Sequence, residues 1–139
     1  MKKGTSRVVL LLASMLMMLV VVGGVAWAVR LVGDNGPNKI IGTNGRDSLS
    51  ALGGSDKVDG KRGADRIWGG AGDDRLIAGP LRTDRGVDRV YGSSGNDTII
   101  TNDEPNRLDY YKCGPGFDTV YADRIDRFYG KRCEVQHVR

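Results

Sequence analysis

A chain of 139 residues with 21 glycines and only 6% aromatic residues has little apolar surface from which to build a conventional core. The formal net charge of +4 is concentrated at the start, because without Lys2, Lys3 and Arg7 the remaining 18 basic residues face 17 acidic ones, which leaves +1. This near-neutral remainder argues against nucleic-acid binding, and the lack of H-E-x-x-H and G-x-S-x-G motifs argues against the common hydrolases.

The first 28 residues have the pattern of an export signal. Lys2, Lys3 and Arg7 precede an apolar run of 18 residues, 8–25, and Ala26-Trp27-Ala28 supplies a small-x-small cleavage pattern. We therefore predict a signal peptide over residues 1–28. The run is also just long enough to cross a bilayer, so an uncleaved anchor is the alternative. In either case residues 29–139 would lie outside the cytoplasm.

From residue 33 onward the sequence repeats every nine residues. Five units occupy residues 33–77, three more occupy 83–109 and a ninth occupies 113–121, after which a decayed unit contains Asp126 and Phe128. A fixed period of this kind predicts a solenoid, in which no unit buries its apolar face without its neighbours.

Three columns define the repeat when its positions are numbered as slots 1 to 9. Slot 4 is glycine in eight of nine units, with Glu104 as the exception. Slot 6 is aspartate in seven units and asparagine (Asn38 and Asn106) in two. Slot 8 is aliphatic throughout: Ile40, Leu49, Val58, Ile67, Leu76, Val90, Ile99, Leu108 and Val120. Glycine permits the positive φ angles of a tight turn, and slots 7 to 9 suit a short strand whose middle residue alone points inward.

These columns resemble the G-G-x-G-x-D-x-U-x repeat of RTX, or haemolysin-type, calcium-binding proteins over residues 33–128, and the unit at 69–77, GGAGDDRLI, matches it throughout. The resemblance implies an all-β fold, a parallel β-roll in which six residues form a turn and three a strand. It also implies Ca²⁺ between turns stacked on the same side, bound by backbone carbonyls and slot-6 carboxylates. The implied metal ligands are Asp47, Asp56, Asp65, Asp74, Asp88, Asp97 and Asp118. The number of ions stays open, because Asn38 and Asn106 lack the charge.

The stacking of the carboxylates gives a physical reason for a cation. In a β-roll units two apart share a side, so Asp56 and Asp74 would lie on one edge and Asp47 and Asp65 on the other. Two bare carboxylates on strands about 4.8 Å apart repel by roughly 3 kcal/mol at an effective dielectric near 20, and a divalent cation turns that repulsion into attraction. In the alternative, each aspartate only accepts hydrogen bonds within its turn, and the solenoid needs no metal.

Two further features concern the ends and the outer faces. Cys113 and Cys133 are the only cysteines, and an exported chain favours a disulfide between them, which would cap the last turns. Slot 7 carries Lys39, Lys57, Arg66, Arg75, Arg89 and Arg107, and slot 9 adds Trp68, Tyr91 and Tyr121. Such a basic, partly aromatic face could bind a glycan or an anionic cell-wall polymer, although charge balance against the aspartates explains the basic column more simply.

We therefore interpret residues 29–139 as a secreted, monomeric, non-catalytic β-roll with a C-terminal disulfide cap, whose folding is coupled to calcium. The alternatives are a module that binds a cell-surface polymer and a structural solenoid that is independent of metal.

Overall fold

The structure is a computed structural model, and it describes residues 27–80, 84–102, 107–130 and 133–138. The predicted signal segment therefore lies outside the described residues, apart from Trp27 and Ala28. Within these ranges no helix has the length and apolar character needed to cross a membrane.

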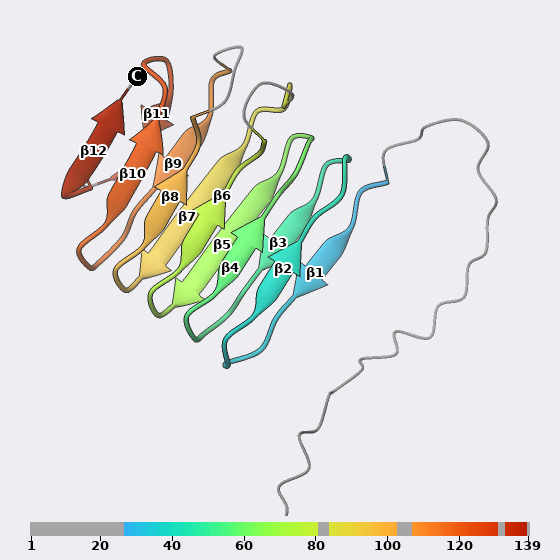
Figure 1. Cartoon of the computed structure of the whole chain (residues 1–139), viewed down its shortest axis with the longest axis horizontal. Helices are drawn as coiled ribbons and strands as arrows, with labels where there is room; N and C mark the ends of the chain where they lie inside the picture. The colour runs from blue at the N-terminus through green and yellow to red at the C-terminus, as the bar shows by residue number, and fades with distance from the viewer. Residues whose placement is uncertain (1–26, 81–83, 103–106, 131–132, 139) are drawn as a thin grey trace, which may run out of the picture.

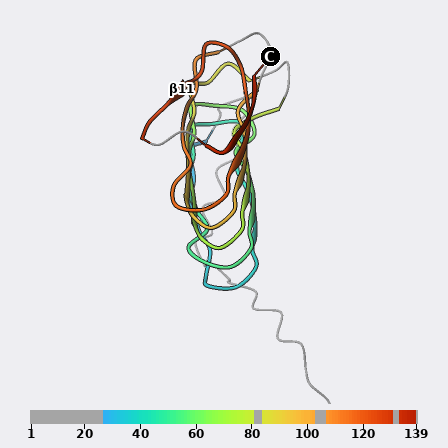
Figure 2. The ribbon, with the colours of Figure 1, turned by 90° about the vertical axis from the view of Figure 1, so that its left-hand side faces the viewer.

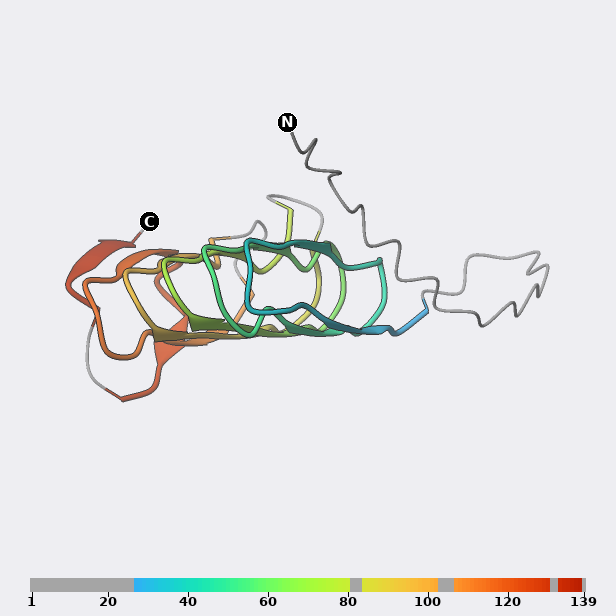
Figure 3. The same cartoon turned by 90° about the horizontal axis from the view of Figure 1, so that it is seen from below.

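The described residues form a flattened parallel solenoid (Figure 1). Odd-numbered strands make one six-stranded sheet, here the odd sheet, and even-numbered strands make the other, the even sheet. The sheets face each other, and the chain passes from one to the other through the turns at both edges (Figures 2 and 3). The strands are β1 (Arg30–Val32), β2 (Lys39–Ile41), β3 (Ser48–Ser50), β4 (Lys57–Asp59), β5 (Arg66–Ala71), β6 (Arg75–Ile77), β7 (Arg89–Ser94), β8 (Thr98–Ile100), β9 (Tyr110–Lys112), β10 (Thr119–Ala122), β11 (Arg127–Phe128) and β12 (Val135–Val138). The predicted parallel β-roll is confirmed.

Equal slots pair across each sheet, as the nine-residue period requires. In the odd sheet Leu49 pairs with Ile67, and Ile67 pairs with Val90. In the even sheet Val58 pairs with Leu76, and Leu76 pairs with Ile99. These side chains are fully buried. The core is therefore two facing columns of single, mostly aliphatic side chains, supplemented by the buried Ala51, Ala78 and Ala122, each of which directly follows a slot-9 residue.

Glycine at slot 4 is required by the stacking of the turns. Gly63 has a φ of +123°, in a region that residues other than glycine rarely adopt. A Cβ atom on Gly63 would also collide with the carbonyl group of Gly45, the slot-4 residue two units earlier. The same column repeats on the other edge, where Gly54 and Gly72 are stacked with φ angles of +106° and +123°.

The sequence-based register is wrong in the eighth unit. It placed Asn106 at slot 6 and Leu108 at slot 8, but Tyr111 is the residue that pairs with Val90 and is buried. Slot 6 is consequently Asp109, whose side chain is 1% exposed, and Leu108 is only half-buried. The three extra residues of this unit are absorbed in the turn before the strand instead of after it, because that keeps both the inward column and the carboxylate column continuous. Arg107 accordingly precedes the strand and does not belong to slot 7.

The predicted disulfide is present. Cys113 and Cys133 are bonded, with their Cα atoms 5.8 Å apart, which is within the usual range for such a bond. Cys113 lies in the turn between β9 and β10 and Cys133 in the turn between β11 and β12, so the bond joins the last two turns of one edge.

Candidate functional site

The slot-6 carboxylates form two buried ladders, one along each edge. We call the edge whose turns lead into the odd strands the odd edge, and the other the even edge. All seven predicted ligands are at most 4% exposed. Asp47, Asp65 and Asp88 lie on the odd edge. Asp56, Asp74, Asp97 and Asp118 lie on the even edge, so the predicted sharing of edges is confirmed.

One oxygen of each carboxylate, Oδ1, holds adjacent coils together. On the odd edge Asp65 Oδ1 accepts the backbone N–H of Asp47 at 2.8 Å, and Asp88 Oδ1 accepts that of Asp65 at 2.7 Å. On the even edge Asp97 Oδ1 accepts the N–H of Asp74 at 3.0 Å, and Asp118 Oδ1 accepts that of Asp97 at 2.9 Å. These hydrogen bonds join adjacent coils, whereas the metal-free alternative places them within one turn, and each of them uses a single carboxylate oxygen.

Three acidic residues that the register missed extend the ladders. Asp109 Oδ1 accepts the N–H of Asp88 at 2.8 Å, and Asp126 Oδ1 accepts that of Asp109 at 2.9 Å. On the even edge Glu134 Oε2 accepts the N–H of Asp118 at 2.8 Å. A signal for Asp109 was available, because only the D-Y-Y-K reading of residues 109–112 keeps an aspartate two residues before the inward side chain.

The second oxygen, Oδ2, has no such role. It is buried and accepts no hydrogen bond in Asp56, Asp65, Asp74, Asp97 and Asp118. A buried acceptor without a partner costs about 1–3 kcal/mol, and more when it is charged. Asparagine in these places would spare the fold that charge while still offering the Oδ1 acceptor. The ladders therefore contain buried anionic oxygens for which a cation would be the natural partner.

Backbone carbonyls and slot-1 glycines surround these free oxygens. A Cβ atom on Gly60 would lie 2.7 Å from Asp65 Oδ2 and would also meet the carbonyl oxygen of Ala78, in the next coil. On the even edge a Cβ atom on Gly69 would meet Asp74 Oδ2 and would lie 2.7 Å from the carbonyl oxygen of Gly92. The glycines thus leave space in which a carboxylate oxygen and a carbonyl oxygen approach each other. An all-oxygen donor set of this kind suits calcium.

The first turns differ from the interior ones. Asp47 Oδ2 accepts the backbone N–H of Thr43, and the Thr43 hydroxyl contacts the same carboxylate, 3.0 Å from its Oδ1. At the first turn of the even edge the Asn38 side-chain amide donates to Asp34 Oδ1 at 2.9 Å, while Asn38 Oδ1 accepts the Asp34 N–H at 2.8 Å. These turns satisfy their own polar groups, and the assignment of Asp47 as a metal ligand stays a prediction that rests on its slot alone.

Burial shifts the ionisation of the interior carboxylates. Burial raises the pKa of Asp65 and of Asp97 to about 7 and that of Asp74 to about 6, although a backbone N–H bond opposes each shift and neighbouring carboxylates add to it. The pKa values of Asp118 and Asp126 are raised for the same leading reason. Without a cation, Asp65, Asp74 and Asp97 therefore hold a proton up to a higher pH than an exposed aspartate does.

The described residues contain no group of three or more histidine, cysteine, aspartate or glutamate side chains close enough to hold a metal by themselves. A cation bound at these edges would consequently need backbone carbonyls to complete its coordination.

Comparison with known proteins agrees with this geometry. Residues 32–65, 50–80 and 81–104 match the RTX calcium-binding nonapeptide repeat, in four copies. No curated protein and no solved structure matches the chain.

Proposed function

Because the chain belongs to the RTX calcium-binding nonapeptide repeat family, we propose that it is a non-catalytic calcium-binding protein whose folding is coupled to the ion. The observation that carries the proposal is the row of buried Oδ2 atoms without hydrogen-bond partners. These atoms make the folded chain costly without a cation, and the thin core of one aliphatic residue per unit has little free energy to offset that cost.

The interior turns are the places where this chain would hold calcium. Asp74 with the Gly92 carbonyl and Asp97 with the Cys113 carbonyl are the candidate donors on the even edge. When bound, the ion supplies positive charge that compensates for the carboxylate burial and links two successive coils. The chain itself contributes the spacing, because the Oδ1 hydrogen bonds fix each carboxylate and the slot-1 glycines keep side chains out of the space.

Thermal and spectroscopic comparison with and without calcium tests the coupling. Far-ultraviolet circular dichroism of the purified protein should show β structure in excess calcium and loss of it in excess chelator. Magnesium at equal concentration is the matched control, because it demands a smaller and more rigid octahedron and should restore less structure. Identical spectra and melting curves under all three conditions would exclude the coupling.

The location of the protein is the second part of the proposal. The export pattern of residues 1–28 and the Cys113–Cys133 bond support a place outside the cytoplasm, since such bonds persist in oxidising compartments. Fractionation of the producing cells should find the chain in the medium or on the cell surface. Determination of the N-terminal residue would distinguish a cut after Ala28 from a retained anchor, and recovery of the protein in the cytoplasm would refute export.

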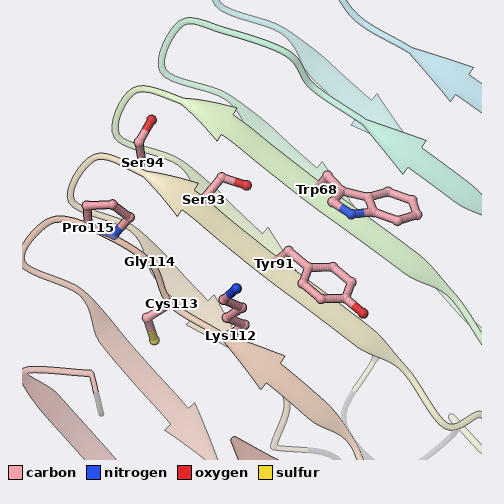
Figure 4. A pocket seen from close by; sticks show the side chains of 8 residues that line it. All are labelled: Trp68, Tyr91, Ser93, Ser94, Lys112, Cys113, Gly114 and Pro115. Atoms are coloured by element: carbon pink, nitrogen blue, oxygen red, sulfur yellow. The ribbon is translucent and has the colours of Figure 1, made fainter. Parts of the chain in front are cut away.

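One surface favours a second function, the binding of an anionic cell-surface polysaccharide. On the outer face of the odd sheet the rings of Trp68 and Tyr91 stack, with centroids 5.6 Å apart and planes 10° apart. Beside them lies a shallow hollow of about 380 Å³, which is also lined by Lys112 and the hydroxyl-bearing Ser93 and Ser94 (Figure 4). Ring faces, hydroxyl groups and an ammonium group are the partners that an acidic sugar needs.

The charge of this face agrees with such a ligand. The described outward positions of this face, at slots 7 and 9, include five basic residues: Arg30, Arg66, Arg89, Lys112 and Arg127. None of these described positions holds an acidic residue. The basic column of this sheet therefore has no acidic partner at the outward positions of the face itself. In excess calcium, Trp68→Ala should weaken retention on an immobilised acidic polysaccharide, whereas Tyr121→Ala on the even sheet should not. Equal retention of both variants, or preference for single-stranded nucleic acid, would argue against the polysaccharide.

A further inference from the structure

Asp84 is a buried carboxylate outside the slot-6 ladders. It belongs to the longer turn between β6 and β7, and it occupies slot 2, where the repeat pattern has glycine. It is fully buried, with 0% of its surface exposed.

The two oxygens of Asp84 have different surroundings. Oδ1 accepts the backbone N–H of Gly86 at 2.8 Å and that of Gly63 at 3.1 Å, and so it joins its own turn to the turn two units earlier. Oδ2 is buried and accepts no hydrogen bond. Lys61, a basic residue of the earlier turn, pairs instead with Asp59, with Nζ 2.8 Å from Oδ2. The fold thus positions Asp84 through one oxygen and leaves the other available inside the protein.

That available oxygen lies in a group of oxygens on the odd edge. Asp84 Oδ2 presses against Gly79, where a Cβ atom would also lie 2.7 Å from the carbonyl oxygen of Lys61. The neighbouring glycine of the earlier turn, Gly60, is similarly flanked by Asp65 Oδ2 and the Ala78 carbonyl oxygen. The two turns are stacked directly, because the Gly60 N–H donates to the Ile77 carbonyl at 2.9 Å. In these two stacked turns, Gly79 and Gly60 are therefore flanked by two carboxylate oxygens and two carbonyl oxygens.

We propose that Asp84 and Asp65 bind one calcium ion together on the odd edge, and that this site is the tightest in the protein. The proposal rests on the calcium-binding function proposed above. Its physical basis is the number of charged ligands, because affinity for calcium rises with the carboxylates that face the ion. The interior turns of the even edge have Leu52, Gly70, Ser93 and Gly114 at slot 2, and so they offer no second carboxylate there.

Calcium titration by isothermal calorimetry, with the purified protein and Ca²⁺ alone, tests the assignment. Asp84→Asn keeps the Oδ1 acceptor and the shape of the side chain but removes the charge. It should weaken the tightest site by about tenfold or more while the remaining sites stay unchanged. Asp73→Asn is the matched control, because Asp73 is exposed, lies on the even edge and keeps its Oδ1 acceptor for the Asn96 N–H. It should leave the tightest site within about twofold of the wild type.

The outcomes separate the two proposals. A wild-type chain that binds no calcium would overturn both. Wild-type titration curves for Asp84→Asn, together with weakened binding by Asp97→Asn, would overturn only the role of Asp84. If Asp84→Asn does not reach the calcium-bound β spectrum, Asp84→Gly restores the residue that the repeat pattern has at slot 2. That variant should lose the tightest site, and an unchanged tightest site in Asp84→Gly would refute the assignment.

Discussion

Asp97→Asn separates the two roles of a ladder carboxylate. Asp97 Oδ1 accepts the N–H of Asp74 at 3.0 Å, which an amide oxygen would do equally well. The substitution therefore leaves the hydrogen-bonded ladder in place and removes only the charge at the buried Oδ2. In calcium the lost charge-assisted contact should cost about 1.5–3 kcal/mol, which corresponds to roughly 10- to 150-fold in affinity at that site. In chelator the effect of the substitution on stability should have the opposite sign. There the substitution removes a buried charge that has no partner, so the metal-free fold should become more stable.

Asp59→Asn is the control for the same change of charge. Asp59 lies at slot 9 on the outside of β4, where its side chain is 25% exposed and pairs with Lys61. Exposed pairs of this kind contribute little, so this variant should stay within about 0.5 kcal/mol of the wild type in both conditions. The assay is thermal melting of the three proteins in excess calcium and in excess chelator. Equal losses in both variants, or a loss by Asp97→Asn that does not depend on calcium, would refute the assignment of Asp97 to a metal-binding edge.

Three further predictions follow from the burial, the covalent cap and the core. Because the folded-state pKa values of Asp65 and Asp97 are raised from 3.8 to about 7, the metal-free fold holds protons more tightly than the unfolded chain, and its stability should fall as the pH rises through about 7. Circular dichroism in chelator should therefore show more β structure at pH 5 than at pH 8, and the reverse order would contradict the burial argument. Reduction of the Cys113–Cys133 bond should destabilise the calcium-loaded protein by about 3 kcal/mol, judged from denaturant melts, and an unchanged midpoint would exclude a capping role. Ile67→Ala should cost about 2–5 kcal/mol in the same melts, whereas a cost below about 1 kcal/mol would mean that the slot-8 column is not tightly packed.

Much of the fold could be predicted because two signals in the sequence agree. The nine-residue period indicates a solenoid, and the resemblance of its glycine, aspartate and aliphatic columns to the RTX repeat implies the two-sided parallel β-roll. The sharing of one edge by Asp56 and Asp74 then follows from units that alternate between two sheets. The disulfide could be predicted from the count of residues, because a separation of 20 places Cys113 and Cys133 about two units apart, in successive turns of one edge.

The register failed where the period is interrupted, and the physical reason is local. Leu108 and Tyr111 are three residues apart, and both suit an inward position. A pattern of residue types does not say whether a turn or a strand end absorbs an insertion. The structure places the extra residues in the turn, because a turn can lengthen without displacing either column, and Tyr111 then fills the core while Asp109 joins the ladder. Asp84 was missed as a candidate ligand for a related reason, since the repeat pattern assigns the metal-binding carboxylate to slot 6 and Asp84 lies at slot 2.

The two ends of the solenoid explain why ions belong to its interior. A cation between coils needs oxygens from two successive turns on one edge, and within the described residues the first turn of the even edge has no earlier turn with which to share a cation. That turn has Asn38 where interior turns have aspartate, and the mutual hydrogen bonds of Asn38 and Asp34 satisfy its polar groups. At the other end the Cys113–Cys133 bond holds the last turns covalently. Terminal repeats in a solenoid must be stable with one neighbour instead of two. Here the hydrogen bonds of Asn38 and the Cys113–Cys133 disulfide meet that need, and the buried Oδ2 atoms without hydrogen-bond partners extend from Asp56 to Asp118, which shares its turn with Cys113.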